Sequence, residues 1–296
     1  LVAASGSSVS VSGSLFIEPG ATLTQGVPRL QVGGNWSSSG TFSAGGGTVA
    51  FVGPSAQALL SGATHFAFLE LASSGGVFWA TAVGAANGVT FATGTTDLGF
   101  ATHSVRGFWA VAGNASFQGS SGTVLFEGSS LQSVQAGTTS RFGRFISSNA
   151  AGVVLTEDAV VDRDIELHRG TLDISSRTVR VRGGLRRSAG LFAGTTSTLL
   201  LDGTSVQALA MGGGAVHTLV VTNSSAGARL DEALVVRGTF TVLPGAVFDG
   251  GASALTVSGS SGAWSTAGAV YRSSGPATHS VLWIPLAGTR LHVADG

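Results

Sequence analysis

Short apolar runs alternate with polar residues along most of this 296-residue chain. Alternation at every second position is typical of a β-strand with one buried face, and the runs are rich in Val, Thr, Phe and Leu. Gly, Ser, Asn and Pro-Gly pairs separate them and indicate turns. No segment carries a 3.6-residue apolar stripe over three helical turns. The pattern therefore predicts an all-β protein in which helix is minor or absent.

The chain also repeats itself with a period of about 75 residues, and internal repeats are typical of solenoids and related arrays. The segment GGTVAFVGPSAQALLSG from Gly46 recurs as SGTVLFEGSSLQSVQAG from Ser121 and as TSTLLLDGTSVQALAMG from Thr196. The same period relates three sets of residues: Phe51, Phe126 and Leu201; Gln57, Gln132 and Gln207; and Gly13, Gly88, Arg163 and Gly238. We predict four repeats, 13–87, 88–162, 163–237 and 238–296, of which the last is divergent.

Each repeat contains about three groups of strands, and each group spans roughly 23 to 26 residues, a length that suits one coil of a parallel β-solenoid. In such a fold the strands of successive coils stack about 4.8 Å apart. The sequence thus predicts a right-handed parallel β-solenoid of about 12 coils, with residues 1–296 forming one continuous domain. Phe51, Phe126 and Ile165 are expected to point into its core. Four immunoglobulin-like β-sandwiches are the alternative, disfavoured by the scarcity of hairpin dipeptides.

The composition removes several classes of function. Hydrophobic residues make up 43% of the chain and charged residues 10%, which excludes an intrinsically disordered protein. The 15 basic residues, all arginine, balance 15 acidic ones, so the charge predicts no binding to nucleic acid. The absence of cysteine excludes disulfides and thiolate metal sites. No apolar run is long enough for membrane insertion as a helix. The chain shows no signal peptide, and we expect that one was removed or lies outside this segment.

The most highly charged stretch contains the one candidate acid cluster. Asp162, Asp164 and Glu166 occupy every second position, so their carboxylates would share one face of a strand. Three interpretations remain open for them. They are the acids of a polysaccharide-cleaving enzyme, a cation site, or a solvated face that pairs with Arg180 and Arg182. The solvated face is favoured, and we predict no catalytic residue, cofactor or metal ion.

Other residues with potential chemistry have structural interpretations. The six histidines do not have the spacing of a metal site: His65, His103, His168, His217, His279 and His292. Five tryptophans would form a sugar-stacking platform if they faced outward, although buried positions are commoner: Trp36, Trp79, Trp109, Trp264 and Trp283. The repeated glutamine at Gln57, Gln132 and Gln207 is expected to stabilise a turn through a side-chain bond to the backbone.

One segment resembles a known repeat pattern. The run GGNWSSSGTFSAGGGTVAFVGPSAQ, Gly33 to Gln57, resembles the GNW..SGTF.AG.GTV.F.G...Q pattern of repetitive bacterial surface and secreted proteins. The whole chain is similar to filamentous-haemagglutinin-like and autotransporter-passenger β-solenoids, with a likeness that weakens along the chain. This resemblance implies an extracellular or bacterial cell-surface location and a structural or adhesive role, and it supplies no catalytic residues.

We therefore expect an extracellular structural protein without catalytic activity, either a fibre or filament subunit or an adhesin stalk. A glycan-binding or polysaccharide-degrading β-helix is the alternative. Neither the segment 1–11 nor the segment 282–296 has the pattern of an amphipathic cap, and an uncapped solenoid exposes strand edges. The chain is then either a slice of a longer rod or a subunit that associates end to end. Glycans and host or cell surfaces are the other expected partners.

Overall fold

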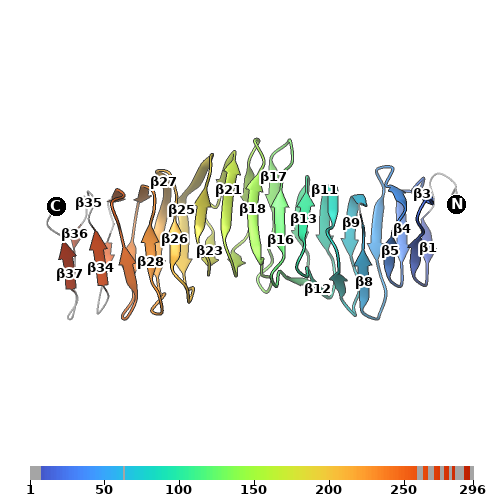
Figure 1. Ribbon diagram of the computed structural model, residues 1–296, viewed down its shortest axis with the longest axis horizontal. Coiled ribbons are helices and arrows are strands. Elements are labelled where there is room, and N and C mark those ends of the chain that lie inside the picture. The colour runs from blue at the N-terminus through green and yellow to red at the C-terminus, as the bar shows by residue number, and fades with distance from the viewer. Residues whose placement is uncertain are drawn as a thin grey trace. The chain divides into compact units, whose positions relative to one another are not determined.

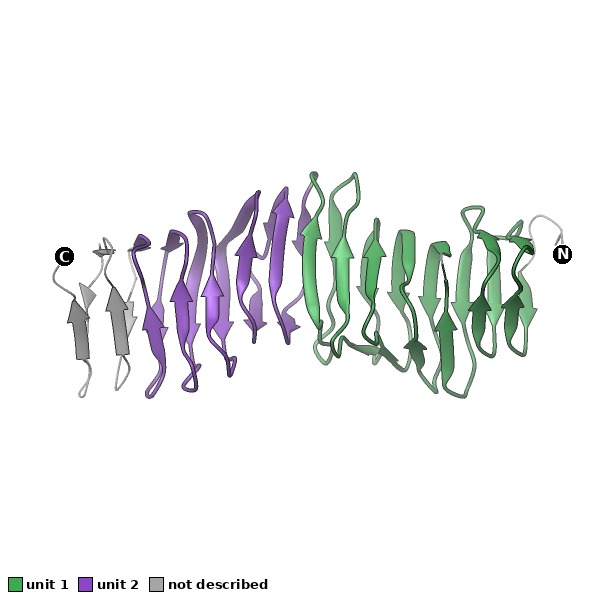
Figure 2. Cartoon of the chain, in the orientation of Figure 1, with its two compact units in different colours: residues 1–151 green, residues 152–296 purple. Residues whose placement is uncertain are grey.

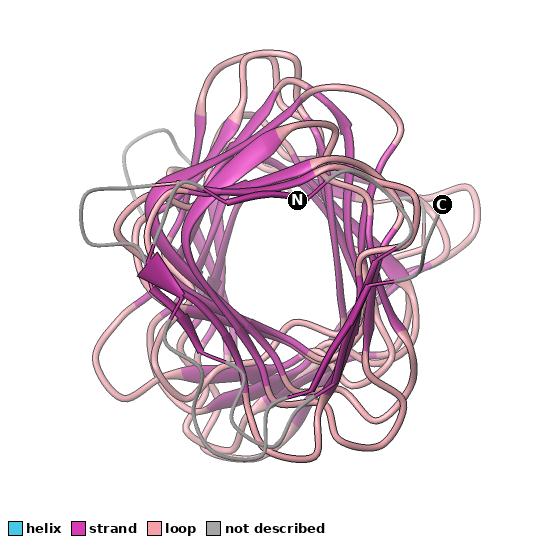
Figure 3. Ribbon diagram, turned by 90° about the vertical axis from the view of Figure 1, so that its left-hand side faces the viewer, coloured by secondary structure: helices cyan, strands magenta, loops and turns pink. Residues whose placement is uncertain are grey.

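A computed structural model of the chain describes residues 8–62, 64–258, 263–265, 270–273, 277–279, 282–283 and 290–293. The chain divides into two compact units, residues 1–151 and 152–296, coloured green and purple in Figure 2. Within the described residues every regular element is a strand, and loops join the strands (Figure 3). The strands pair in parallel and stack as a β-solenoid of about 12 turns, so the predicted fold is confirmed.

The strands of unit 1 are short because each forms only one side of a coil (Figure 1). They are β1 (Val9–Val11), β2 (Leu15–Ile17), β3 (Thr22–Thr24), β4 (Arg29–Val32), β5 (Trp36–Ser38), β6 (Thr41–Ser43), β7 (Thr48–Phe51), β8 (Gln57–Leu60), β9 (His65–Leu71), β10 (Val77–Trp79), β11 (Gly84–Phe91), β12 (Thr95–Asp97), β13 (Thr102–Val105), β14 (Phe108–Val111), β15 (Ser116–Gln118), β16 (Thr123–Phe126), β17 (Gln132–Val134) and β18 (Arg144–Ser148).

These strands form three main parallel ladders in unit 1, which we call faces one, two and three. Face one runs through β1, β4, β7, β9, β11, β14 and β17. Face two is the sheet β2, β5, β8, β10, β12 and β15. Face three runs through the first residues of β9 and β11, then β13, β16 and β18. The strands β3 and β6 pair separately.

Unit 2 continues the same kind of strand. Its strands are β19 (Val153–Leu155), β20 (Ala159–Val161), β21 (Ile165–Arg169), β22 (Thr171–Asp173), β23 (Thr178–Val181), β24 (Leu185–Arg187), β25 (Leu191–Leu201), β26 (Gln207–Leu209), β27 (Gly214–Val221), β28 (Ala228–Leu230), β29 (Leu234–Val236), β30 (Phe240–Val242), β31 (Val247–Asp249), β32 (Leu255–Val257), β33 (Ala263–Ser265), β34 (Val270–Ser273), β35 (Ala277–His279), β36 (Leu282–Trp283) and β37 (Arg290–Val293). Three parallel ladders run through them, starting at β19, β20 and β21.

The coils are shorter than the sequence suggested. On face one, Val49 pairs with Leu69 and Leu69 with Val89. One coil therefore takes roughly 20 residues, at the short end of the range for solenoid repeats. Most other steps are similar. Longer steps occur, among them Trp36 to Leu59, Trp109 to Val134 and Leu185 to Leu209, each of which contains one copy of the repeated glutamine. The coil length expected from the sequence was too long, and the sequence repeat does not equal a whole number of coils.

Inward-facing positions are apolar and closely packed in both units. Phe51 and Phe126 have no exposed surface and Ile165 has 2%, which confirms the predicted inward direction of all three. In unit 1 the core is aromatic, with ring centroids 4.6 Å apart for Phe91 and Trp109 and 4.7 Å apart for Phe126 and Phe145. In unit 2 it is mostly valine and leucine. Burial of these rows supplies the main driving force for stacking the coils.

Candidate functional site

Each copy of the repeated glutamine clamps a corner between two coils. Gln57 Oε1 accepts a hydrogen bond from the Gly53 amide at 3.1 Å. Its Nε2 donates to Val32 O and Gly34 O of the preceding coil, at 2.9 and 2.5 Å. Gln57 is 2% exposed, and it satisfies three backbone groups, of which Gly53 N and Val32 O are buried and Gly34 O is partly buried. We call this arrangement a glutamine clamp.

The other two copies make the same bonds. Gln132 accepts from Gly128 N and donates to Val105 O and Gly107 O, at 2.8, 2.9 and 2.8 Å. Gln207 accepts from Gly203 N and donates to Val181 O and Gly183 O, at 2.9, 2.8 and 2.9 Å. The predicted turn-stabilising bond is confirmed, and its reach into the preceding coil is an addition that the sequence did not reveal.

The following coil reinforces two of the clamps with a buried asparagine. Asn149 Nδ2 donates to Gln132 Oε1 at 2.9 Å, and Asn223 Nδ2 donates to Gln207 Oε1 at 3.2 Å. Both amides also bond to the corner backbone, at Ser130 O and Ser205 O, each at 2.7 Å. The clamp is thus part of a polar network that spans three successive coils. Fully satisfied buried networks of this kind fix one arrangement of the backbone.

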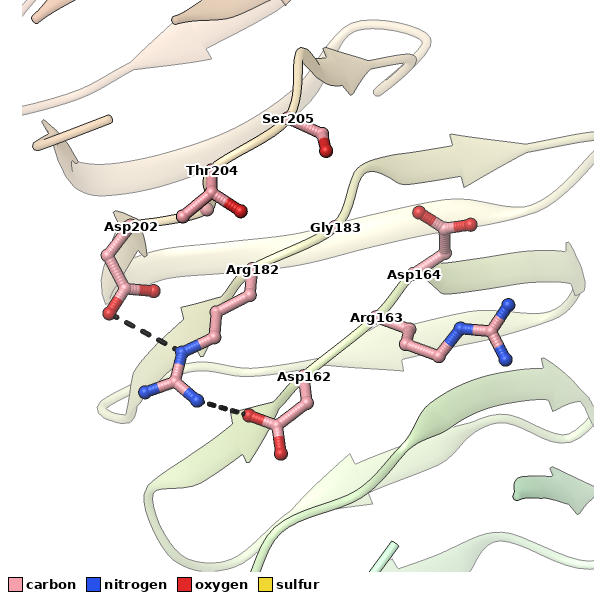
Figure 4. Close-up of a pocket in the computed structure, with 9 residues that line it drawn as sticks. Asp162, Arg163, Asp164, Arg182, Gly183, Asp202, Thr204 and Ser205 are labelled. Carbon is pink, nitrogen blue, oxygen red and sulfur yellow. Dashed lines mark hydrogen bonds and ion pairs between the residues drawn. The ribbon is translucent and has the colours of Figure 1, made fainter. Parts of the chain in front are cut away.

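The third clamp corner, in unit 2, carries a charged pocket of about 500 Å³. Three corner loops stack there, and the lining residues are Asp162, Arg163, Asp164, Arg182, Gly183, Asp202, Gly203, Thr204 and Ser205. Figure 4 shows Arg182 between Asp162 and Asp202, with Arg163 and Asp164 on the other side of the pocket. We call this the corner pocket.

The charges in the corner pocket are matched by ion pairs along the stack of coils. Arg182 Nη1 donates to Asp162 Oδ1 at 2.7 Å, and its Nε lies 3.8 Å from Asp202 Oδ2. Arg180 Nη1 approaches the same Asp202 oxygen at 3.3 Å. Asp164 Oδ1 accepts the Gly184 amide at 2.7 Å. The guanidinium of Arg182 is therefore held in place from two sides, which orients its remaining N–H groups.

The candidate acids do not lie together on one strand face. Asp162 and Asp164 belong to the corner that follows β20, whereas Glu166 lies beyond it, on β21. Glu166 is 8% exposed, and His168 Nε2 lies 3.2 Å from its Oε2. It lines a second, smaller pocket of about 190 Å³ with His168, Arg186, Arg187 and Ser188. Alternation along the chain misled the prediction because the strand ends at Val161 and the backbone turns there.

The favoured interpretation of the tryptophans, burial in the core, is confirmed for three of the five, and the alternative of a sugar-stacking platform is wrong for these three. Trp36, Trp79 and Trp109 are at most 1% exposed and lie in the core of unit 1. Their rings pack edge-on against neighbours such as Phe42 and Phe117, at 4.9 and 5.0 Å. The side chains of Trp264 and Trp283 lie outside the described residues. No sugar can stack on the three buried rings.

One histidine has a clear structural role. His103 is fully buried on β13, accepts the Val83 amide at Nδ1 and places Nε2 2.6 Å from Leu98 O. Burial lowers the pKa of His103 to about 4, so the ring is neutral near pH 7. Within the described residues no group of three His, Asp or Glu side chains could hold a metal ion. The predicted structural interpretation therefore holds for His103.

No protein-family model, curated protein or solved structure matches the chain. Among the described residues no helix is long and apolar enough to cross a membrane.

Proposed function

We propose that this chain is an extracellular structural β-solenoid, a fibre subunit or adhesin stalk that carries out no chemical reaction. The observation that supports the proposal most directly is the glutamine clamp. At all three copies the repeat preserves the same three bonds from a buried side chain to the backbone. Outward-facing residues at the same corners vary, from Gly33 to Arg106 and Arg182. The copies of the repeat thus share the hydrogen bonds that hold the coils together, whereas their outward-facing residues differ.

The acidic residues fit the same role. Asp162 is engaged by Arg182, and Asp164 by a backbone amide with Arg186 Nε at 3.9 Å. Carboxylates that face a stacked row of coils need such counter-charges, since like charges at strand spacing repel. We therefore assign Asp162 and Asp164 to pairing between coils and assign no catalytic step to them.

End-to-end association is the second part of this proposal. Within the described residues, β1 pairs with β4 and β2 pairs with β5, each on one side only. The inward residues Val9 and Val11 are only partly covered there. An edge of this kind is a template for another strand, and a second copy of the chain would supply one by a head-to-tail contact that does not close.

A concentration series tests this proposal. Sedimentation velocity and electron microscopy at neutral pH should show assemblies that lengthen as the protein concentration rises. Changing Val9 and Val11 together to lysine puts charge at inward positions of the edge and should abolish the assemblies. Ser10→Lys, on the outward face of the same strand, is the matched control and should leave them intact. Assemblies that survive the paired lysines, or monomers at every concentration, would contradict association through this edge.

The absence of catalysis is tested separately. A panel of polysaccharides incubated with the purified chain should release no new reducing ends. If cleavage occurs and disappears in a folded variant with Asp162, Asp164 and Glu166 changed to Ala, the structural proposal is wrong and the chain is a polysaccharide-degrading enzyme.

A further inference from the structure

The three clamp corners offer an internal comparison for the corner pocket. At the first clamp, Gln57 binds the carbonyls of two residues that flank Gly33. Ser12 and Gly13 of the preceding coil lie next to this segment. At the third clamp the corresponding residues are Arg182, Asp162 and Arg163. The glutamine makes the same three bonds in both cases. The clamp therefore does not require the charges of the corner pocket.

The size and lining of the pocket suit a small polar ligand. Its volume of about 500 Å³ lies within the range of small-molecule sites. The lining includes two guanidinium groups, three carboxylates and the hydroxyls of Thr204 and Ser205, which come from three successive coils. Thr204 and Ser205 are exposed. Both donors and acceptors thus line a space of limited size.

The balance of charge selects the class of ligand. The lining holds Arg163 and Arg182 against three aspartates, and Arg180 and Arg186 approach from outside. A site for an anion would present excess positive charge, and a cation site would present carboxylates without interposed arginines. A ligand with neighbouring hydroxyl groups suits this mixture, because each hydroxyl both donates to a carboxylate and accepts from a guanidinium.

One acceptor in the pocket wall is also unsatisfied. Asp202 Oδ1 is buried and accepts no hydrogen bond within the described residues, while its Oδ2 faces Arg180 and Arg182. A buried acceptor without a donor has lost its hydration without replacement, which is unfavourable. Because Oδ1 has almost no exposed surface, a ligand hydroxyl reaches it only if the Asp202 side chain turns toward the pocket.

We infer that the corner pocket binds a neutral saccharide, with Asp162, Arg182 and Asp202 as the hydrogen-bonding residues. This site is independent of the structural role, since a stalk needs no ligand at this corner. It also differs from the tryptophan platform that the sequence left as an alternative, because it uses polar side chains of unit 2.

Saturation-transfer difference NMR tests the inference directly. The probes are glucose, galactose, mannose and N-acetylglucosamine, with maltose, cellobiose, lactose and chitobiose as disaccharides. At least one probe should give a signal, and its Kd should weaken by about tenfold or more when Asp162→Asn and Arg182→Gln are combined. The matched control combines Arg106→Gln with Glu127→Gln, the ion pair at the second clamp corner, and should leave the Kd unchanged.

A second variant and a salt titration distinguish a neutral saccharide from a charged ligand. Thr204→Val with Ser205→Ala, two exposed loop positions, should also weaken binding, and this variant keeps the fold even if the charge variants lose it. Binding should be insensitive to added salt. The inference is overturned if none of the eight sugars gives a signal. It is also overturned if the corner variants bind as the wild type does, or if only dextran sulfate binds and NaCl abolishes that binding.

Discussion

Gln57 and Gln132 occupy the same place in successive repeats and make the same three hydrogen bonds, yet they lie on different faces of unit 1. Gln57 begins β8 on face two, and Gln132 begins β17 on face one. From Gln57 the ladder passes through Val77 and Thr96 to Phe117, three coils further on. The next clamp lies beyond Phe117 but before a fourth coil closes. The sequence repeat thus rotates around the solenoid as it advances.

Because of this rotation, the clamp stabilises corners on different faces of the solenoid. The residues required are local: a glycine four positions before the glutamine and two carbonyls of the coil below. Any corner that supplies them accepts the motif. Outward residues of successive repeats therefore point in different directions, so the repeat builds no continuous stripe along unit 1.

Replacing Gln132 with leucine should destabilise unit 1 by about 2 to 4 kcal/mol, because Gly128 N, Val105 O and Gly107 O would lose their partner. Leucine is similar in size, so the effect isolates the hydrogen bonds. Hydrogen exchange of the Gly128 amide and urea unfolding measure it. Gln118→Leu is the control, since that side chain makes one long bond of 3.4 Å, and it should change stability by less than about 0.5 kcal/mol. Equal effects of the two changes would contradict the clamp.

Gly107→Ala should be among the most harmful single-methyl additions in the chain. A Cβ at this position would lie 1.7 Å from Asn87 O of the coil below. Backbone must move to admit it, at a cost of about 3 kcal/mol. Gly13→Ala is the matched control, because a Cβ there meets nothing within 4 Å and its φ is not in the left-handed region. Thermal unfolding compares the two, and a neutral Gly107→Ala would show that the coils are not stacked this closely.

Phe126→Ala should cost about 3 to 5 kcal/mol, the usual range for removing a fully buried ring. Its ring packs on Phe145 at 4.7 Å, so the cavity would open between two successive coils. Phe100→Ala, at a ring that is 79% exposed, should be nearly neutral. Urea unfolding separates the two variants. Similar stabilities would count against the register of β16 and β18.

The fold was predictable because every coil repeats the same demand for inward apolar residues and glycine corners. Phe51, Phe126 and Ile165 show this, since alternation alone placed them inside. The coil length was not predictable from the repeat period, because that period spans a fractional number of coils. The same difficulty affected Asp162 and Glu166: two residues four apart share a face only if no corner lies between them.

The sequence also did not reveal which residues form hydrogen bonds to another coil. Asn149 and Asn223 support their clamps from 17 and 16 residues away, so the two asparagines fall one position out of register with the repeat. Strict periodicity therefore overlooks them. A search for polar residues nearly one coil beyond each repeated glutamine would have found both.

His103 should make unit 1 sensitive to acid. In the folded protein burial lowers its pKa to about 4, against 6.5 for an ordinary histidine. In the unfolded chain His103 binds a proton as the pH falls below 6.5, whereas in the folded chain it binds one only near pH 4. Stability from this group is therefore complete above pH 6.5 and is lost as the pH falls toward 4, by about 3 kcal/mol in total.

Urea unfolding followed by tryptophan fluorescence between pH 4 and 7 measures this loss, and Trp79, whose ring lies 4.7 Å from His103, is a suitable reporter. Carboxylates titrate in the same range in every variant, so the informative quantity is the difference between variants. His103→Leu should be less stable than the wild type at pH 7, because Val83 N and Leu98 O lose their partner, and the difference should shrink toward pH 4. His217→Gln, at an exposed position, should follow the wild-type curve. If His103→Leu instead stays parallel to the wild type across the range, the histidine is protonated without cost and the acid sensitivity has another origin.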